Sequence, residues 1–178
     1  PILEEGSEFA VKWSNLSDAQ MNEGIRDPIK AFEYMNRYYV LEGNKRVSVL
    51  KYFNAVSIPA IVTRKIPKLS DDYDVKLYYE YMKFNEITGL CSVEFTKLGN
   101  ADKLLSLVGK EGRWDDETKE KFAKVMFDFS KVYNFRGGDR LDIKLGDAIT
   151  VFMEVFGMDA MLEMSENDYN KNIINTWK

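Results

Sequence analysis

A strand-to-helix turn around residue 43 constrains the fold of this chain more than any other feature of the sequence. Residues 38–41 form an apolar run typical of a strand, Glu42 and Gly43 follow it, and a helical pattern begins directly after Lys45 and Arg46. The first amides of a helix have no partner inside the helix and carry partial positive charge, so such a turn attracts anions. Gly43 permits a sharp turn and lets a ligand approach the backbone. We therefore expect a phosphate to bind here.

The segments on either side of this turn predict a small sheet. A hairpin is expected before it, with Asn36 and Arg37 at the hairpin turn, and a further turn is expected at Asn54. The predicted elements are, in chain order, strands over residues 29–35 and 38–42, a helix over residues 47–53 and a strand over residues 58–63.

These segments resemble the ParB/sulfiredoxin-like superfamily over about residues 23–65. Residues 24–29 resemble its Gly-(Leu/Ile)-x-x-Pro-Ile segment, residues 43–46 its Gly-x-basic-Arg turn, and residues 58–62 its Ile-Pro-(Ala/Val)-x-Val strand. The resemblance implies an α+β fold, in which a small mixed sheet with helices binds a nucleotide or its phosphates above the glycine turn.

The residue types in the turn bear on the chemistry that the resemblance implies. Sulfiredoxins carry a nucleophilic cysteine directly after the glycine, where this chain has Asn44, so sulfiredoxin chemistry is disfavoured. Partition proteins usually have a glutamate there, whereas kinase members carry an acid before the glycine, as Glu42 is here. The resemblance thus implies Gly43, Asn44, Lys45 and Arg46 as ligand-binding residues for a nucleoside triphosphate with Mg²⁺, and Glu42 as the candidate catalytic residue.

The same residues also fit a turn without a ligand. Glycine followed by basic residues is common where a strand passes into a helix, and Lys45 and Arg46 can be solvated or paired with surface carboxylates. Glu42 can equally cap the turn that follows it.

Composition limits the chemistry further. The chain has 178 residues, of which 45% are hydrophobic, enough for one large or two small domains. It contains no histidine, which removes the usual serine and cysteine triads and most zinc sites. Catalysis would rest on carboxylates, lysine or a substrate-borne metal such as Mg²⁺. No carboxylate spacing predicts a metal site made by the protein alone.

Charge is distributed unevenly along the chain. Residues 28–68 contain eight Lys/Arg and two Asp/Glu, a net charge of +6, whereas the rest of the chain carries 17 and 27, a net charge of −10. This asymmetry favours an anionic ligand on the ParB-like segment. Duplex DNA is disfavoured as a partner because the acidic remainder would repel it and the isoelectric point is near 5.1. The cations could instead pair with the acidic half.

The second half, residues 70–178, is expected to be a helical accessory region packed against the first domain, residues 1–69. The predicted caps are Ser70, Asn100 and Ser165, and residues 90–95 are expected to be extended. Cys91 is expected in the core and is compatible with a reducing cytoplasm. Exposed tryptophans at positions 13, 114 and 177 could mark a partner surface. Helices are expected over residues 72–87, 100–108, 115–135, 143–156, 159–164 and 165–177.

The beginning of the chain predicts one helix, over residues 9–23, and no leading strand. In the resembled family this region supplies another strand, so the chain is either a fragment of a longer protein or has that strand elsewhere. Neither a signal peptide nor a membrane span is expected, and a bacterial cytoplasmic protein is the prediction.

Three functions stay open on this basis. The first is a nucleotide-binding domain that acts as a regulatory switch or in phosphoryl transfer. The second is an interaction or assembly module that has kept the fold and holds a protein partner through its helical region. The third is a DNA-binding partition-type protein.

Overall fold

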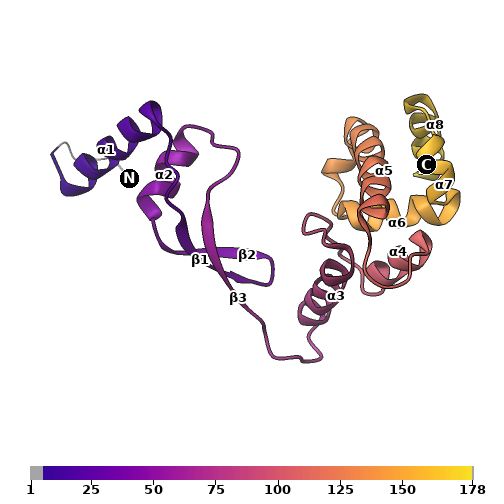
Figure 1. Ribbon diagram of the computed structural model, residues 1–178. Coiled ribbons are helices and arrows are strands. Elements are labelled where there is room, and N and C mark those ends of the chain that lie inside the picture. Colours follow the sequence, from indigo (N-terminus) through magenta and orange to yellow (C-terminus); the bar gives the residue numbers. More distant parts are fainter. Residues whose placement is uncertain (1–5, 178) are drawn as a thin grey trace. The chain divides into compact units, whose positions relative to one another are not determined.

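The computed structural model describes residues 6–177 of this α+β protein (Figure 1). The chain divides into two compact units, Pro1–Lys68 and Leu69–Lys178. The first contains two helices and all three strands of the described residues, and the second is helical. No helix among residues 6–177 is long and apolar enough to cross a membrane.

The first unit opens with α1 (Glu8–Asn22), which packs against α2 (Asn44–Tyr52). Ser7 caps α1, as its hydroxyl accepts a hydrogen bond from the backbone N–H of Ala10 at 3.2 Å. The Trp13 ring meets Tyr52 edge-on at 5.3 Å, and its indole N–H donates to the Ser48 hydroxyl. Trp13 is therefore half-buried and joins two helices of its own unit.

The sheet has the order β2-β1-β3, with β1 (Ile29–Tyr34) in the centre. β2 (Arg37–Glu42) pairs with it antiparallel, and β3 (Ala60–Lys65) pairs with it parallel. The hairpin turn is Met35–Asn36, with φ of 50° and 62°, one residue earlier than the sequence predicted. Two successive positive φ values give the turn a twist that matches the strands, and asparagine tolerates such a φ well.

One face of the sheet is buried on its central strand. Ile29, Ala31 and Glu33 alternate along β1 and are 5%, 3% and 1% exposed. The Ile29 side chain lies beside Gly43, which precedes α2. The buried Glu33 carboxylate accepts a hydrogen bond from Arg64 Nε on β3 at 2.6 Å and another from the Asn36 backbone N–H at 2.7 Å. This carboxylate therefore joins the hairpin turn to the neighbouring strand.

The second unit is a bundle around one aromatic core, formed mainly by α3 (Tyr73–Thr88), α5 (Asp116–Phe135) and α6 (Leu145–Phe156). The remaining elements are α4 (Asn100–Val108), a 3₁₀ turn (Gly138–Arg140), α7 (Met158–Glu163) and α8 (Glu166–Thr176). The helix predictions for this unit are confirmed to within two residues at their ends, whereas α2 of the first unit begins at Asn44, three residues before the predicted start. Fully buried side chains from four helices fill the centre: Phe84, Leu104, Phe122, Phe129, Ile149 and Phe152.

Two predicted caps and one predicted strand are wrong. Asp72 caps α3, because its carboxylate accepts from the second and third amides of the helix, and Ser70 lies too early to do so. Gly99, in a left-handed conformation, precedes α4 in place of Asn100. Residues 90–95 form a loop, since their apolar side chains, Val93 and Phe95, insert into the helical core without a neighbouring strand.

Two further expectations about single side chains are also corrected. Cys91 is exposed, because it lies at the start of this loop, before Val93, where the loop first buries a side chain fully in the core. Trp114 is 3% exposed and packs against Phe84 and Phe122, so it belongs to the core.

Asp147 holds the same loop against α6. Its buried carboxylate accepts hydrogen bonds from the Thr96 backbone N–H at 2.6 Å, from the Thr96 hydroxyl and from Asn100 Nδ2 at 2.7 Å. Asn100 therefore bonds across to α6, which explains why it is not the cap of α4.

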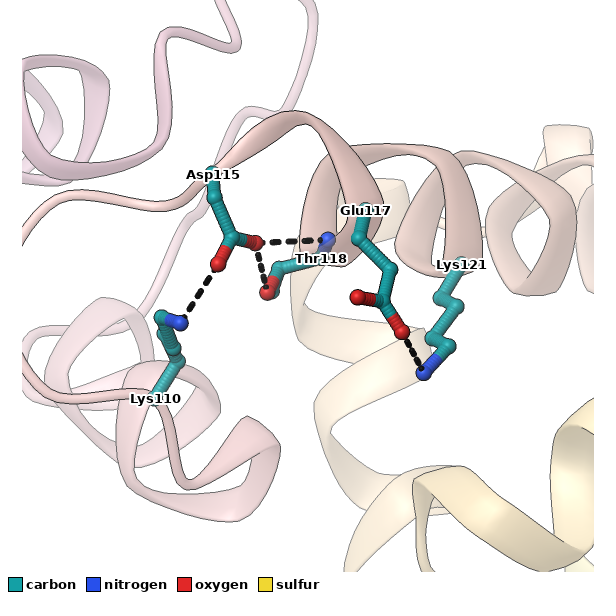
Figure 2. A network of polar contacts seen from close by, with 5 residues as sticks. All are labelled: Lys110, Asp115, Glu117, Thr118 and Lys121. Atoms are coloured by element: carbon teal, nitrogen blue, oxygen red, sulfur yellow. Dashed lines mark hydrogen bonds and ion pairs between the residues drawn. The ribbon is translucent and has the colours of Figure 1, made fainter.

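Acidic residues stabilise the start of α5 (Figure 2). Lys110 donates to the Asp115 carboxylate at 2.6 Å, and the Thr118 backbone N–H and hydroxyl donate to it at 2.9 and 2.6 Å. These bonds, the one from Lys110 first, hold the pKa of Asp115 well below its usual range. In the first turn of the helix, Glu117 pairs with Lys121 at 2.6 Å. An anion thus occupies the positive end of this helix, as the helix dipole favours.

Candidate functional site

The strand-to-helix turn has the glycine geometry that the sequence predicts. Gly43 has φ of 98°, a left-handed conformation that residues with a side chain rarely adopt. A Cβ placed on Gly43 would lie 2.6 Å from Ile29 Cγ2 and 3.2 Å from Arg46 Nε. Glycine is therefore required here both by backbone conformation and by space.

The first turn of α2 is electrostatically unusual. No side chain caps it, no acid lies in it, and its residues include Lys45 and Arg46. Within residues 6–177 every other helix has a side-chain cap or an acid in its first turn. Two cations next to the positive end of a helix dipole repel it and each other, and an anion would relieve that repulsion.

The two cations of the turn point to different neighbours. Arg46 donates from Nη1 to the backbone carbonyls of Asp27 and Pro28 at 3.1 and 2.9 Å. Its Nε and Nη2 donors have no partner among residues 6–177. Lys45 Nζ lies 5.2 Å from the centre of the Phe9 ring on α1. Arg46 thus fixes the segment that leads into β1, while three of its five N–H donors stay available to a ligand.

Glu42 ends β2 and lies at the edge of the turn. It is exposed and pairs with Lys30 on β1 at 2.8 Å. The hydrogen bond and the charge of Lys30, with a smaller contribution from Arg46, lower the pKa of Glu42. A carboxylate with a lowered pKa is a weaker base, so this geometry suits Glu42 to holding a cation better than to removing a proton.

A cleft of about 380 Å³ adjoins the turn on its Arg46 side. Its apolar part comes from α1 and the segment after it, and two arginines and two carboxylates give it polar groups. The lining residues are Leu16, Ala19, Glu23, Gly24, Ile25, Arg26, Asp27 and Arg46. Its volume lies within the range of small-molecule sites, and half of its lining residues are charged, which suits a polar, charged ligand.

The structure brings only part of the predicted site to this cleft. Arg46 lines it, whereas Gly43, Asn44 and Lys45 do not. Arg26 was missed by the sequence analysis. Its side chain is exposed and forms no hydrogen bond or ion pair with residues 6–177. The sequence feature that could have identified Arg26 is its position two residues before Pro28, where the predicted strand segment begins.

No group of three or more Cys, Asp or Glu side chains within residues 6–177 is placed to hold a metal ion. Comparisons with protein-family models, with curated proteins and with solved structures give no match to this chain.

Proposed function

We propose that the first unit binds a nucleotide or another phosphate-bearing small molecule at the start of α2. The observation that carries the proposal is a helix that begins uncapped at a left-handed glycine, with two cations and no acid in its first turn. An anion at such a terminus gains about 0.3–1 kcal/mol from the helix alone, and arginine adds charge-assisted hydrogen bonds.

The cleft supports a nucleotide over a bare phosphate. Leu16, Ala19 and Ile25 offer an apolar surface for a base, and Glu23 and Asp27 are acceptors for hydroxyl or amino groups. Arg46 lines this cleft and also belongs to the turn, so it would contact phosphates between the two. Arg26, which has no ion pair within the described residues, supplies a second phosphate contact.

Magnesium would be held mainly by the phosphates of such a ligand. Mg²⁺ keeps several waters and commonly takes one or two carboxylates together with substrate phosphates. Glu42 fits this role because it lies at the end of β2, directly before the turn, and its lowered pKa keeps it ionised.

The test is a thermal-shift titration of the full chain with CTP, ATP, GTP and ADP, each with and without Mg²⁺. A ligand at a hundredfold excess over its Kd should stabilise the folded state by about 2.7 kcal/mol. The diagnostic variant is Arg26→Ala, because Arg46→Ala also removes two bonds to backbone carbonyls and would lower stability without any ligand.

Lys51→Ala is the matched control, since Lys51 is an exposed cation in the last turn of the same helix. We expect the shift to persist in this control and to shrink in Arg26→Ala. No shift with any of the nucleotides contradicts the proposal and favours the interaction module. An equal loss of the thermal shift in Arg26→Ala and Lys51→Ala would show that nucleotide binding depends only on the net charge of the protein.

A further inference from the structure

We propose that the first unit also binds single-stranded nucleic acid, on the face of its sheet opposite to the buried one. This surface, named here the open face, is defined by the strand register, because directly paired residues project to the same side. It consists of Lys30, Phe32 and Tyr34 on β1, Arg37, Tyr39 and Glu42 on β2, and Ile61, Thr63 and Lys65 on β3.

The open face is exposed over all three strands. Tyr34, Tyr39 and Ile61 are 41%, 51% and 60% exposed, and Phe32, in the centre, is half-buried. The alternate residues of β1 are buried on the other face, where Ile29 lies against the start of α2. In the described part of the first unit, no helix covers the open face.

Three aromatic rings lie close together on this surface. Phe32 and Tyr34 are two residues apart on one strand, a separation of about 6.6 Å. Tyr39 is directly opposite Phe32, at about 5 Å. The spacing along the strand is about twice the 3.4 Å rise per base of a stacked strand, so the exposed rings of Tyr34 and Tyr39 can take separate bases from an unstacked chain.

Two cations flank the same rings. Arg37 and Lys65 are the register partners of Tyr34 on its two sides, so the three side chains form one row across the sheet. Lys65 Nζ also lies 4.7 Å from the centre of the Phe32 ring. Within residues 6–177 neither cation has a carboxylate partner, whereas Lys30 pairs with Glu42. Unpaired cations beside stacking rings complement a backbone of phosphates that carries bases.

The arrangement favours a single strand over a duplex. Bases stack on aromatic rings only when their own faces are accessible, which a duplex does not allow. An acidic peptide would satisfy Arg37 and Lys65 but would leave the aromatic rings without stacking partners. The strongly acidic remainder of the chain also limits the attraction of a long duplex.

The experiment measures fluorescence anisotropy of labelled oligo(U) and oligo(dT) of about 12 nucleotides, a length within the site sizes of single-strand binders. The full chain is titrated at low salt. We expect binding to weaken with salt, with a log–log slope of about −1.4 for two phosphates. Tyr39→Ala should weaken binding about 5- to 150-fold, the effect of losing one stacked base.

Tyr38→Ala is the matched control, because Tyr38 is the preceding residue on the same strand, is 67% exposed and projects to the opposite face. We expect it to bind like the unchanged protein. Lys65→Gln should make the salt slope shallower by about 0.7. Thermal melts of each variant verify that it is folded.

Four results would overturn the proposal. The first is no binding of either oligonucleotide at low salt. The second is equal weakening by Tyr38→Ala and Tyr39→Ala, which would show that the open face is not the stacking surface. The third is equal affinity for a duplex of the same length, which would indicate attraction by charge alone. The fourth is loss of oligonucleotide binding in Arg26→Ala, which would place the strand in the nucleotide cleft. The proposed nucleotide function can fail without affecting this inference, because Arg26 does not belong to the open face.

Discussion

Replacing Gly43 by alanine tests the turn on which the nucleotide proposal depends. An added methyl group meets two separate obstacles. The backbone φ of 98° costs a residue with a side chain about 1–2 kcal/mol. The new Cβ would also lie 2.6 Å from Ile29 Cγ2, closer than two carbon atoms can approach. Ile29 is β-branched and 5% exposed, so it cannot easily move aside.

The expected loss of stability follows from adding these terms. Overpacking of a buried site costs about 1–3 kcal/mol, so Gly43→Ala should destabilise the first unit by about 2–5 kcal/mol. Gly24→Ala is the matched control in the same unit. Gly24 has φ of 77°, but a Cβ there would meet nothing within 4 Å. The control should therefore lose only the backbone term, about 1–2 kcal/mol.

Hydrogen exchange read by mass spectrometry measures the loss of stability in the first unit separately from the second. The opening free energy of the peptide that covers β1 should fall in both variants, by more in Gly43→Ala, while peptides from the α5 core of the second unit stay unchanged. Equal losses in the two variants would refute the contact with Ile29. A neutral Gly43→Ala would refute the left-handed turn itself.

Two predictions concern buried groups of the second unit. Asp147→Asn should lower the free energy of unfolding of the second unit by about 2–3 kcal/mol in a urea titration. The reason is that the asparagine amide would place an N–H donor against groups that donate to the carboxylate. A loss under about 0.5 kcal/mol would contradict this. Burial, with a smaller effect of the Asp128 charge, raises the pKa of Tyr169. Unfolding then releases a proton that the folded state keeps, so stability should fall as pH rises above 10, and Tyr169→Phe should flatten that fall in pH-dependent melts.

The helices of the second unit were predicted well because apolar residues at helical spacing predict a helix with one buried face. Phe122, Phe129 and Tyr133 share one face of α5 at helical spacing, and all three are buried. The loop around Val93 was misjudged for the same reason. An apolar run without helical spacing predicts a strand, but here the run packs on a helical core that only tertiary structure supplies.

The sequence analysis predicted the turn at Gly43, but it did not predict the cleft or the open face. Gly43 and its cations are adjacent in sequence, so their motif could be recognised. Arg26 and Leu16 join the cleft only because α1 folds back beside α2, which no local pattern shows. The open face was missed because the alternation on β2 is weak. Tyr38 and Tyr39 are consecutive, and only the pairing with β1 shows which of them lies on the open face.

The structure shows which cations of residues 28–68 form ion pairs and which account for the net charge of +6. Both acids of the segment, Glu33 and Glu42, pair with cations of the segment, Arg64 and Lys30. The six remaining cations form no close ion pair within the described part of the first unit, although the charge of Lys45 contributes to lowering the pKa of Glu8. Four of them divide between two surfaces: residues 45 and 46 at the start of α2, and residues 37 and 65 on the open face. The charge asymmetry therefore predicts two separable anion sites, so Arg26→Ala and Lys65→Gln should each impair one ligand and spare the other.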